Sequence, residues 1–278
     1  MLKALVLREK GEIKLPESVL DSNSKTGFTS QLTSSQLIEI DLETKEEILE
    51  FRSQFSSLSE DILFLDKLFH KDQKTLIVFD MDSTLIQQEI IDELARYAGV
   101  YDRVSEITEE AMQGKIDFEE SLRKRCKLLK GLDVEVFEII YRKLSLNPGV
   151  KEFLDESRNW NFHKGVISGG FSTIIQKFAL DYGFDYFKAN HLEEINGKLS
   201  GEILGEIIDR NNKQKYFRRF KEKSGATQTI AIGDGANDKL MLDSADLGIG
   251  FKPKNGLKKE IYNWVDFTPM DFIFHLFV

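Results

Sequence analysis

Residues 75–84 read Thr-Leu-Ile-Val-Phe-Asp-Met-Asp-Ser-Thr, and their first half is a short, nearly continuous apolar run. Runs of this kind, rich in β-branched and aliphatic residues, are typical of strands that are buried on both faces of a parallel sheet. Two acids, Asp80 and Asp82, follow the run at once. Ligands of open α/β sheets bind outside the carboxyl ends of the strands, so these acids are candidate site residues.

Three further apolar runs occur later in the chain, at residues 165–167, 229–232 and 247–251. Helical stretches alternate with them, which predicts an α/β fold with a Rossmann-like, doubly wound parallel sheet. Residues 80–164 separate the first two runs, whereas a crossover between parallel strands needs only about a dozen residues. Residues 87–147 of this gap are helical in pattern. They predict a helical cap inserted after the first core strand, with the core at 73–86 and 148–278.

Residues 1–72 have a different pattern, which predicts a small N-terminal α+β segment. Residues 2–7 and 37–42 are expected to be strands, and the polar residues 21–36 between them a loop. Thr44 begins a helical pattern, and Glu47 stands three residues later, which is the spacing of a capping box. No catalytic motif occurs in this segment, so its role stays open.

The net charge and the cysteine content of the chain indicate which partners it should not bind and in which cell compartment it is expected. The formal net charge is −9, and an acidic surface repels nucleic acid and anionic lipid, so we expect neither as a partner. The single cysteine, Cys126, forms no intrachain disulfide and no thiolate zinc cluster. No secretory signal is visible and no apolar run is long enough to span a bilayer. We therefore expect a cytoplasmic protein.

Acidic, hydroxyl and glycine residues follow each of the first three predicted strands. Ser168, Gly169 and Gly170 follow the second run, and a Gly-Asp-Gly-Ala-Asn-Asp sequence at 233–238 follows the third. Four carboxylates at one sheet edge repel one another unless a cation or protons neutralise them. Oxygen-only ligands select a hard cation such as Mg²⁺, which supplies a positive field for a phosphoryl group.

The order of these groups indicates phosphoryl chemistry. Asp80, at the end of a buried strand, is placed to attack phosphorus as a covalent nucleophile. Asp82 lies two residues on, on the same face of an extended chain, and is placed to protonate the leaving oxygen and then activate water. Lys213 precedes the third run and could neutralise both the phosphate and Asp80. Each feature alone is usually a turn, a loop or a surface charge, and only their combination favours catalysis.

At these positions the chain resembles the haloacid dehalogenase superfamily of phosphohydrolases. Its four motifs are similar to residues 80–84, to Ser168, to Lys213 and to residues 233–238, and residues 89–95, 112–115 and 118–125 resemble the phosphoserine phosphatase branch. The resemblance covers about 76–251. It implies hydrolysis of O-phospho-L-serine, the last step of serine biosynthesis, through an aspartyl-phosphate intermediate.

The resemblance also implies residue roles. Asp80 would be the nucleophile and Asp82 the general acid and base; Mg²⁺ would be held by the Asp80 carboxylate, the Asp82 backbone carbonyl and Asp234, with Asp238 supporting it. The residues implied in substrate binding are Glu89, Arg125, Ser168, Gly169, Lys213 and Asn237. Arg125 lies on the same helical stripe as Phe118 and Leu122, where an unpartnered charge is costly, so it suits a substrate carboxylate. It could equally be an arginine whose stem runs along the edge of that stripe, and Glu89 could simply favour the dipole of the helix it begins.

Several alternatives stay open. The same chemistry could act on another small phosphomonoester, such as phosphohomoserine or phosphoethanolamine, or transfer the phosphoryl group to another alcohol. A binding protein on this fold would be expected to lack Asp80 or Asp82. Asn196-Gly197 predicts a hairpin between residues 191–195 and 198–203, near the cap. A homodimer is a further possibility.

Overall fold

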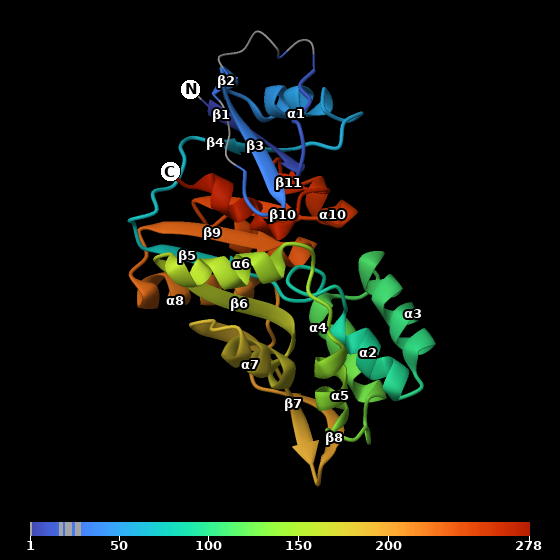
Figure 1. The fold of residues 1–278 in the computed structure, drawn as a ribbon. Helices are drawn as coiled ribbons and strands as arrows, with labels where there is room; N and C mark the ends of the chain where they lie inside the picture. Colours follow the sequence, from blue (N-terminus) through green and yellow to red (C-terminus); the bar gives the residue numbers. More distant parts are fainter. Residues whose placement is uncertain (1, 17–18, 20–23, 26–28) are drawn as a thin grey trace.

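The computed structural model describes residues 2–16, 19, 24–25 and 29–278. One sheet runs through the molecule, in the strand order β2-β3-β1-β4-β11-β10-β9-β5-β6-β7-β8 (Figure 1). The core strands are β5 (Thr75–Phe79), β6 (Phe162–Phe171), β7 (Tyr186–Ile195), β9 (Gln228–Gly233), β10 (Leu247–Phe251) and β11 (Trp264–Val265). Neighbours among these six are parallel, which confirms the predicted α/β fold class.

Helices cover both faces of the parallel sheet, because the apolar side chains of β5 point alternately to one face and to the other. Ile77 and Phe79 pack into one hydrophobic cluster, and Leu76 and Val78 into another. The first cluster includes residues of α6 (Val150–Glu156), α7 (Ser172–Asp181) and the 3₁₀ helix η4 (Met270–Leu276). The second includes residues of α8 (Arg210–Ser224), α9 (Lys239–Leu242) and α10 (Asn255–Lys258). Because successive side chains of a strand point to opposite faces, the short apolar run is buried throughout.

Four helices form the cap between β5 and the second core strand, as predicted. They are α2 (Ile90–Tyr97), α3 (Tyr101–Met112), α4 (Phe118–Leu128) and α5 (Val136–Lys143), and they lie together beside the core (Figure 1). Asp117 caps α4, where its side chain accepts a hydrogen bond from the Glu120 amide at 2.8 Å. The predicted hairpin is confirmed as β7 and β8 (Lys198–Leu204), and both Asn196 and Gly197 have positive φ.

The N-terminal segment adds antiparallel strands to the core sheet. Its elements are β1 (Leu2–Glu9), β2 (Ser24–Lys25), β3 (Thr33–Ile40), α1 (Lys45–Ser53) and β4 (Asp61–Leu65), and β4 pairs with β11. In β1, Ala4 and Val6 pack with α1, whereas Leu5 and Leu7 join the main core. The capping box of Thr44 and Glu47 is confirmed. The predicted boundary at residues 72 and 73 stays a prediction.

Two predicted boundaries are wrong. The loop predicted for residues 21–36 ends earlier, because β3 begins at Thr33; residues 21–23 and 26–28 of that loop lie outside the described residues. Thr33 and Ser35 are polar but buried, and their hydroxyls bind Asp271 and His275, so the strand tolerates them. The second core strand continues past residue 167 to Phe171, with an irregular register against β7.

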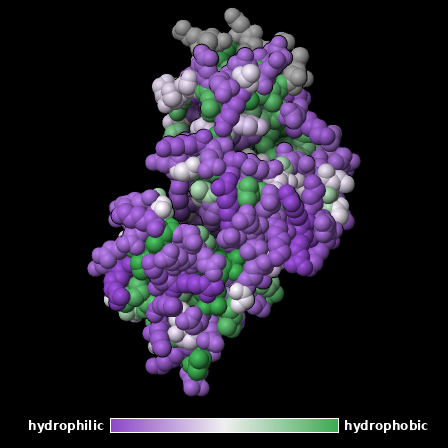
Figure 2. Space-filling view, turned by 180° about the vertical axis from the view of Figure 1, so that it is seen from behind, coloured by the Kyte–Doolittle hydropathy of each residue, from purple (hydrophilic) through white to green (hydrophobic). Residues whose placement is uncertain are grey.

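The surface is largely hydrophilic on the face seen in Figure 2, where hydrophobic residues form small, separate groups. Within the described ranges, no helix is long and apolar enough to cross a membrane.

Candidate active site

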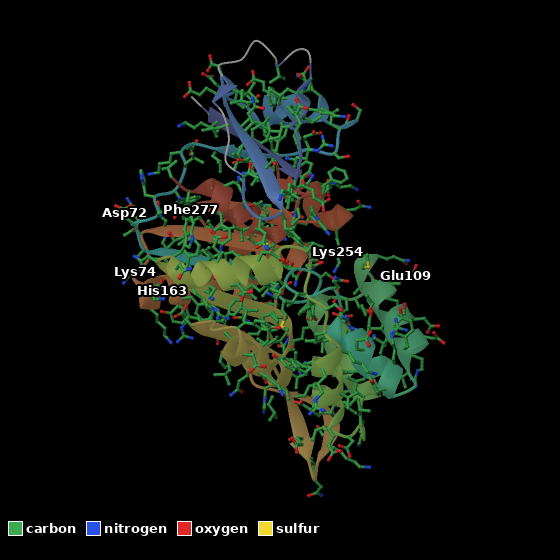
Figure 3. All side chains as sticks on the ribbon, viewed as in Figure 1. Asp72, Lys74, Glu109, His163, Lys254 and Phe277 are labelled. Atoms are coloured by element: carbon green, nitrogen blue, oxygen red, sulfur yellow. The ribbon has the colours of Figure 1, made fainter. Side chains whose placement is uncertain are left out.

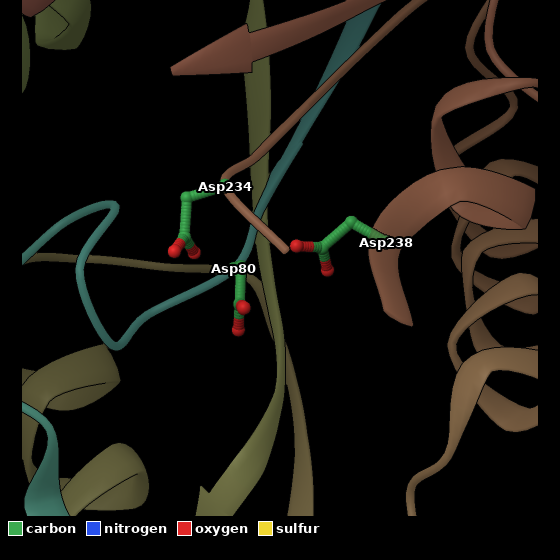
Figure 4. A group of neighbouring side chains, drawn as sticks. All are labelled: Asp80, Asp234 and Asp238. Atoms are coloured by element: carbon green, nitrogen blue, oxygen red, sulfur yellow. The ribbon is translucent and has the colours of Figure 1, made fainter. Parts of the chain in front are cut away.

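Three buried carboxylates meet at the carboxyl ends of β5 and β9. Asp80 follows β5, Asp234 follows β9, and Asp238 ends the 3₁₀ helix η3 (Ala236–Asp238). Each offers an oxygen within 4.8 Å of the others, and their side chains converge in Figure 4. Because β9 and β5 are neighbours in the sheet, acids that are far apart in sequence become adjacent here.

A buried lysine lies against two of these acids. Lys213 stands in the first turn of α8, a helix that Asp209 caps by accepting a hydrogen bond from the Asn212 amide. The Lys213 Nζ atom is fully buried and lies 2.8 Å from Asp80 Oδ2 and 2.6 Å from Asp238 Oδ1. An ammonium held so firmly is a fixed positive charge at the point where a phosphate would meet Asp80.

Burial shapes the protonation of the acid cluster. Desolvation and the charge of Asp238 raise the pKa of Asp80 to about 6, although Lys213 opposes them. Desolvation likewise raises the pKa of Asp234 to about 6, against the pull of Lys254. Burial in a poorly hydrated site thus disfavours the charged forms of these acids, and a bound cation would restore them.

The donor set fits a hard divalent ion. Asp234 Oδ1 accepts a hydrogen bond from Thr84 Oγ1 at 3.2 Å, whereas the buried Asp234 Oδ2 has no hydrogen-bond donor and only an ionic contact with Lys254 Nζ at 3.0 Å. The ammonium of Lys254 is half-exposed and leaves lone pairs of this carboxylate free for a metal ion. Oxygen atoms of Asp80, Asp234 and Asp238 could therefore hold a metal ion of the kind that prefers oxygen.

Asp82 lies beside this cluster, close enough to Asp80 and Glu89 to feel their charges. The chain turns from Asp82 to Leu85, and Ser83 has a φ of +59°. Desolvation, followed by the charges of Glu89 and Asp80, raises the pKa of Asp82 well above its ordinary value. Its Oδ1 atom is buried without a hydrogen-bond partner, so a protonated Asp82 would have a free donor.

The Ser168-Gly169-Gly170 segment forms the wall facing Asp82. Ser168 Oγ accepts a hydrogen bond from the Gly170 amide at 2.8 Å, and Asn190 Nδ2 donates to the Gly169 carbonyl at 2.7 Å. A Cβ atom on Gly170 would lie 3.1 Å from Ser168 Oγ and 3.2 Å from Asp82 Oδ2. A side chain at position 170 would thus need Ser168 or Asp82 to shift by a few tenths of an ångström, so the close approach favours glycine.

Glu89 and Lys254 form an ion pair at the exposed side of the cluster. Glu89 is the N-cap residue of α2 but makes no side-chain cap, so its carboxylate is available for other contacts. Its Oε1 atom accepts hydrogen bonds from Ser83 Oγ and Lys254 Nζ, both at 2.8 Å. Burial disfavours the charged form of Glu89, yet Lys254 and Ser83 keep the pKa of Glu89 below its ordinary value.

Arg125 lies on the cap helix α4, half-buried, with few firm contacts. Its Nε and Nη1 atoms donate to the Ser121 carbonyl and to Thr108 Oγ1, each at 3.4 Å. Desolvation lowers the pKa of the Arg125 guanidinium, and among nearby charges Asp92 and Glu89 oppose that shift. The remaining donors of the guanidinium are therefore open to a ligand.

Asn237 lies in η3 between two members of the acid cluster. Its Oδ1 atom folds back to within 2.3 Å of the place where a Gly235 Cβ would stand. The roles predicted for it and for the other site residues stay predictions, but the fold does gather most of them at one sheet edge.

The sequence reasoning missed several residues of this site. Lys254, Thr84, Ser83 and Asn190 were not singled out, although each contacts a predicted site residue. Thr84 and Ser83 follow Asp82 directly, so their proximity could have been inferred. Lys254 lies in a lysine-rich stretch after β10, where neither spacing nor composition separates it from its neighbours.

Comparisons with known proteins agree with this geometry. Residues 77–243 match the family described as haloacid dehalogenase-like hydrolase. The chain is 45% identical over 209 residues to a phosphoserine phosphatase of Archaeoglobus fulgidus, covering 74% of this chain and 61% of the relative. It is also 45% identical over 183 residues to a phosphoserine phosphatase of Streptococcus thermophilus, covering 65% of this chain and 85% of the relative. The chain thus spans only about three fifths of the Archaeoglobus protein.

Solved structures extend the similarity to the fold. A substrate-bound phosphoserine phosphatase complex superposes with a TM-score of 0.69 at 38% identity, covering 74% of this chain and all of that one. A HAD family hydrolase from Salmonella enterica serovar Typhi superposes with a TM-score of 0.89 at 26% identity, covering 99% of this chain and 98% of that one. The second similarity includes the N-terminal segment.

Proposed function

Because this chain belongs to the haloacid dehalogenase-like hydrolase family, we propose that it is a Mg²⁺-dependent phosphatase that hydrolyses O-phospho-L-serine to L-serine and phosphate. The observation that carries the proposal is the buried ion pair of Asp80 with Lys213, which stands beside Asp82 at the end of one core strand. The relatives named phosphoserine phosphatase support the choice of substrate.

The first half of the reaction uses Asp80 and Asp82. A carboxylate oxygen of Asp80 forms a bond to phosphorus while the bond from phosphorus to the serine oxygen breaks, which leaves an aspartyl phosphate. Asp82, kept protonated by burial and by Glu89, gives its proton to the departing serine oxygen.

The second half returns the enzyme to its starting state. Asp82 is now a carboxylate and takes a proton from water, whose oxygen attacks phosphorus. The bond from phosphorus to Asp80 then breaks, and phosphate leaves. One group thus serves as acid and then as base, and burial, which raises the pKa of Asp82, favours its protonated form at the start.

The positive charges of the site stabilise the phosphoryl group throughout. A Mg²⁺ ion held by the Asp80 carboxylate, the Asp82 backbone carbonyl and Asp234, with support from Asp238, would neutralise charge that develops on the phosphoryl oxygens. Lys213 supplies a fixed charge from the other side, and we expect Ser168, Gly169 and Asn237 to donate hydrogen bonds to the phosphate. Glu89 and Arg125 are proposed to bind the ammonium and carboxylate of the serine part, because their charges are complementary to it.

A phosphate-release assay over a panel of phosphorylated metabolites tests the proposal. With Mg²⁺, phosphoserine should give the highest kcat/KM, ahead of phosphohomoserine and phosphoethanolamine. Asp80→Asn should reduce turnover at least about a thousandfold while the far-ultraviolet circular dichroism spectrum stays unchanged, because the amide is a poor nucleophile. Near wild-type turnover in that variant would refute the nucleophile, and a better substrate in the panel would replace phosphoserine.

Added alcohols separate hydrolysis from phosphoryl transfer in the same assay. Transfer would lower the free phosphate released per serine formed, whereas hydrolysis keeps the two equal. A cytoplasmic location and a homodimer are also proposed; the buried free thiol of Cys126 suits a reducing compartment.

A further inference from the structure

Lys254 joins the metal-binding loop to the start of the cap. Its Nζ atom lies 3.0 Å from Asp234 Oδ2 and 2.8 Å from Glu89 Oε1. Its backbone amide donates to the Asp234 carbonyl at 2.8 Å, which fixes the base of the side chain. The side chain itself is half-exposed, and Figure 3 places Lys254 on the side of the core that faces the cap.

A divalent ion on Asp234 Oδ2 would compete with the Lys254 ammonium, which contacts the same oxygen at 3.0 Å. Asp234 Oδ1 already accepts a hydrogen bond from Thr84 Oγ1, so Oδ2 is the oxygen more open to a metal ion, and Lys254 Nζ is the cation that now contacts it. A divalent ion binds a carboxylate oxygen at about 2.1 Å, which would place two like charges next to each other, screened by water only on the half-exposed side of Lys254. The ammonium has a second carboxylate in contact, Glu89, and a flexible stem on which to move.

We propose that Lys254 occupies the cation position beside Asp234 in the metal-free enzyme, and that ion binding moves it onto Glu89 alone. This inference rests on the proposed divalent ion. Lys254 is then a positioning residue: it keeps the buried acid paired while the ion is away, and it competes with the ion for Asp234. The side chain of Lys254 then links two events: binding of the ion at Asp234, and the contacts made by Glu89 at the start of the cap.

Isothermal titration of Mg²⁺ into the metal-free protein tests the competition. Lys254→Met should bind Mg²⁺ about tenfold more tightly than wild type, because the ion no longer displaces an ammonium. The metal-free variant should also melt at a lower temperature, and saturating Mg²⁺ should close that gap. Lys259→Met is the matched control, because Lys259 is exposed, lies five residues away and carries the same charge; its affinity should stay within about twofold of wild type.

The outcomes separate this inference from the proposed function. Equal or weaker Mg²⁺ binding by Lys254→Met would refute the competition while leaving the phosphatase intact. Absence of Mg²⁺ binding to the wild type at millimolar concentrations would refute both. A crystal structure of the wild type with Mg²⁺ gives a second measurement that needs no variant: Lys254 Nζ should lie beyond 4 Å from Asp234 Oδ2 and within about 3.5 Å of Glu89. An unbroken contact with Asp234 would overturn the proposal.

Discussion

Lys213 and Arg125 are both cations of the candidate site, but Lys213 is held tightly by its neighbours and Arg125 is held loosely. Lys213 is fully buried, and both of its carboxylate partners are within 2.8 Å, so little freedom remains to it. Arg125 makes only two long hydrogen bonds and keeps donors free. Arg125 can therefore turn its donors to a ligand that arrives and leaves, whereas Lys213 is held in place by two carboxylates and keeps one N–H for a third partner.

Arg125→Ala should therefore impair phosphoserine more than a substrate that has no carboxylate. We expect KM for phosphoserine to rise about ten- to a hundredfold, because a charge-assisted hydrogen bond contributes roughly 1.5–3 kcal/mol, and KM for p-nitrophenyl phosphate to change little. Arg123→Ala is the control, since Arg123 pairs with Glu119 on the outer face of the same helix. Equal losses on both substrates would make Arg125 a structural residue.

Individual site residues could be predicted where they follow a strand. Asp80 and Asp234 come directly after the strands β5 and β9, so the pattern of apolar runs is enough to predict where they lie. Lys254 gave no such signal, because its role depends on Glu89, which is 165 positions away. Contacts of that range are set by the path of the chain, which local pattern does not encode.

Among the elements, β4 and β11 join the N-terminal segment to the core, and Arg52 of α1 fastens that junction. Its guanidinium lies 3.4 Å from the centre of the Trp264 ring, and its Nη atoms donate to the carbonyls of Ile62 and Trp264 at 2.6 and 2.7 Å. One side chain thus bonds both strands of the pair.

Arg52→Met should lower the free energy of unfolding by about 2–4 kcal/mol, because two charge-assisted hydrogen bonds and a cation–π contact are lost while the apolar stem remains. Urea denaturation measures the change. Glu50→Met, at an exposed position of the same helix, should change it by less than about 0.5 kcal/mol. If the two variants were equally stable, Arg52 would not fasten the junction.

The helices and strands that could be predicted from sequence are those stabilised by residues close to them in the chain. The capping box of α1 and the Asn-Gly hairpin depend on neighbouring residues, and both were predicted correctly. β11 has only two residues, and its pairing with β4 joins segments that are distant in sequence, so no pattern revealed it. The start of β3 was misplaced because Thr33 and Ser35 look like loop residues until their buried partners are known.

Taken across the whole molecule, a buried polar network ties the first residues of β3 to η4 near the end of the chain. Asp271 accepts hydrogen bonds from Ser30 Oγ and Thr33 Oγ1, both at 2.6 Å. The two ring nitrogens of His275 contact the hydroxyls of Ser35 and Ser30, at 2.7 and 2.9 Å. A neutral imidazole satisfies both hydroxyls, one as donor and one as acceptor.

His275 should make stability depend on pH below neutrality. Burial lowers the pKa of His275 to about 4, against the pull of Asp271, from an ordinary value of 6.5. The unfolded chain therefore takes up a proton near pH 6.5 that the folded protein resists, so this stabilisation is present above pH 6.5 and is lost progressively as the pH falls to 4. The loss attributable to His275 is up to about 3 kcal/mol.

Urea denaturation at pH 7.0, 5.5 and 4.5 measures this contribution. His275→Gln keeps a donor and an acceptor but does not titrate, so its stability should fall less steeply than that of the wild type across this range. The buried acids of the active site are common to both proteins and cancel in the comparison. Parallel curves would show that His275 is not responsible.

The pairing of β4 with β11 has one more consequence, for proteins shortened at the N-terminus. If the chain began at Lys74, β11 would become the last strand on its side, with its amide and carbonyl groups exposed toward solvent beside Trp264 and Val265. An unprotected margin of that kind recruits strands from other molecules. By covering this edge of the sheet, the N-terminal segment would keep the protein from associating with itself through β11.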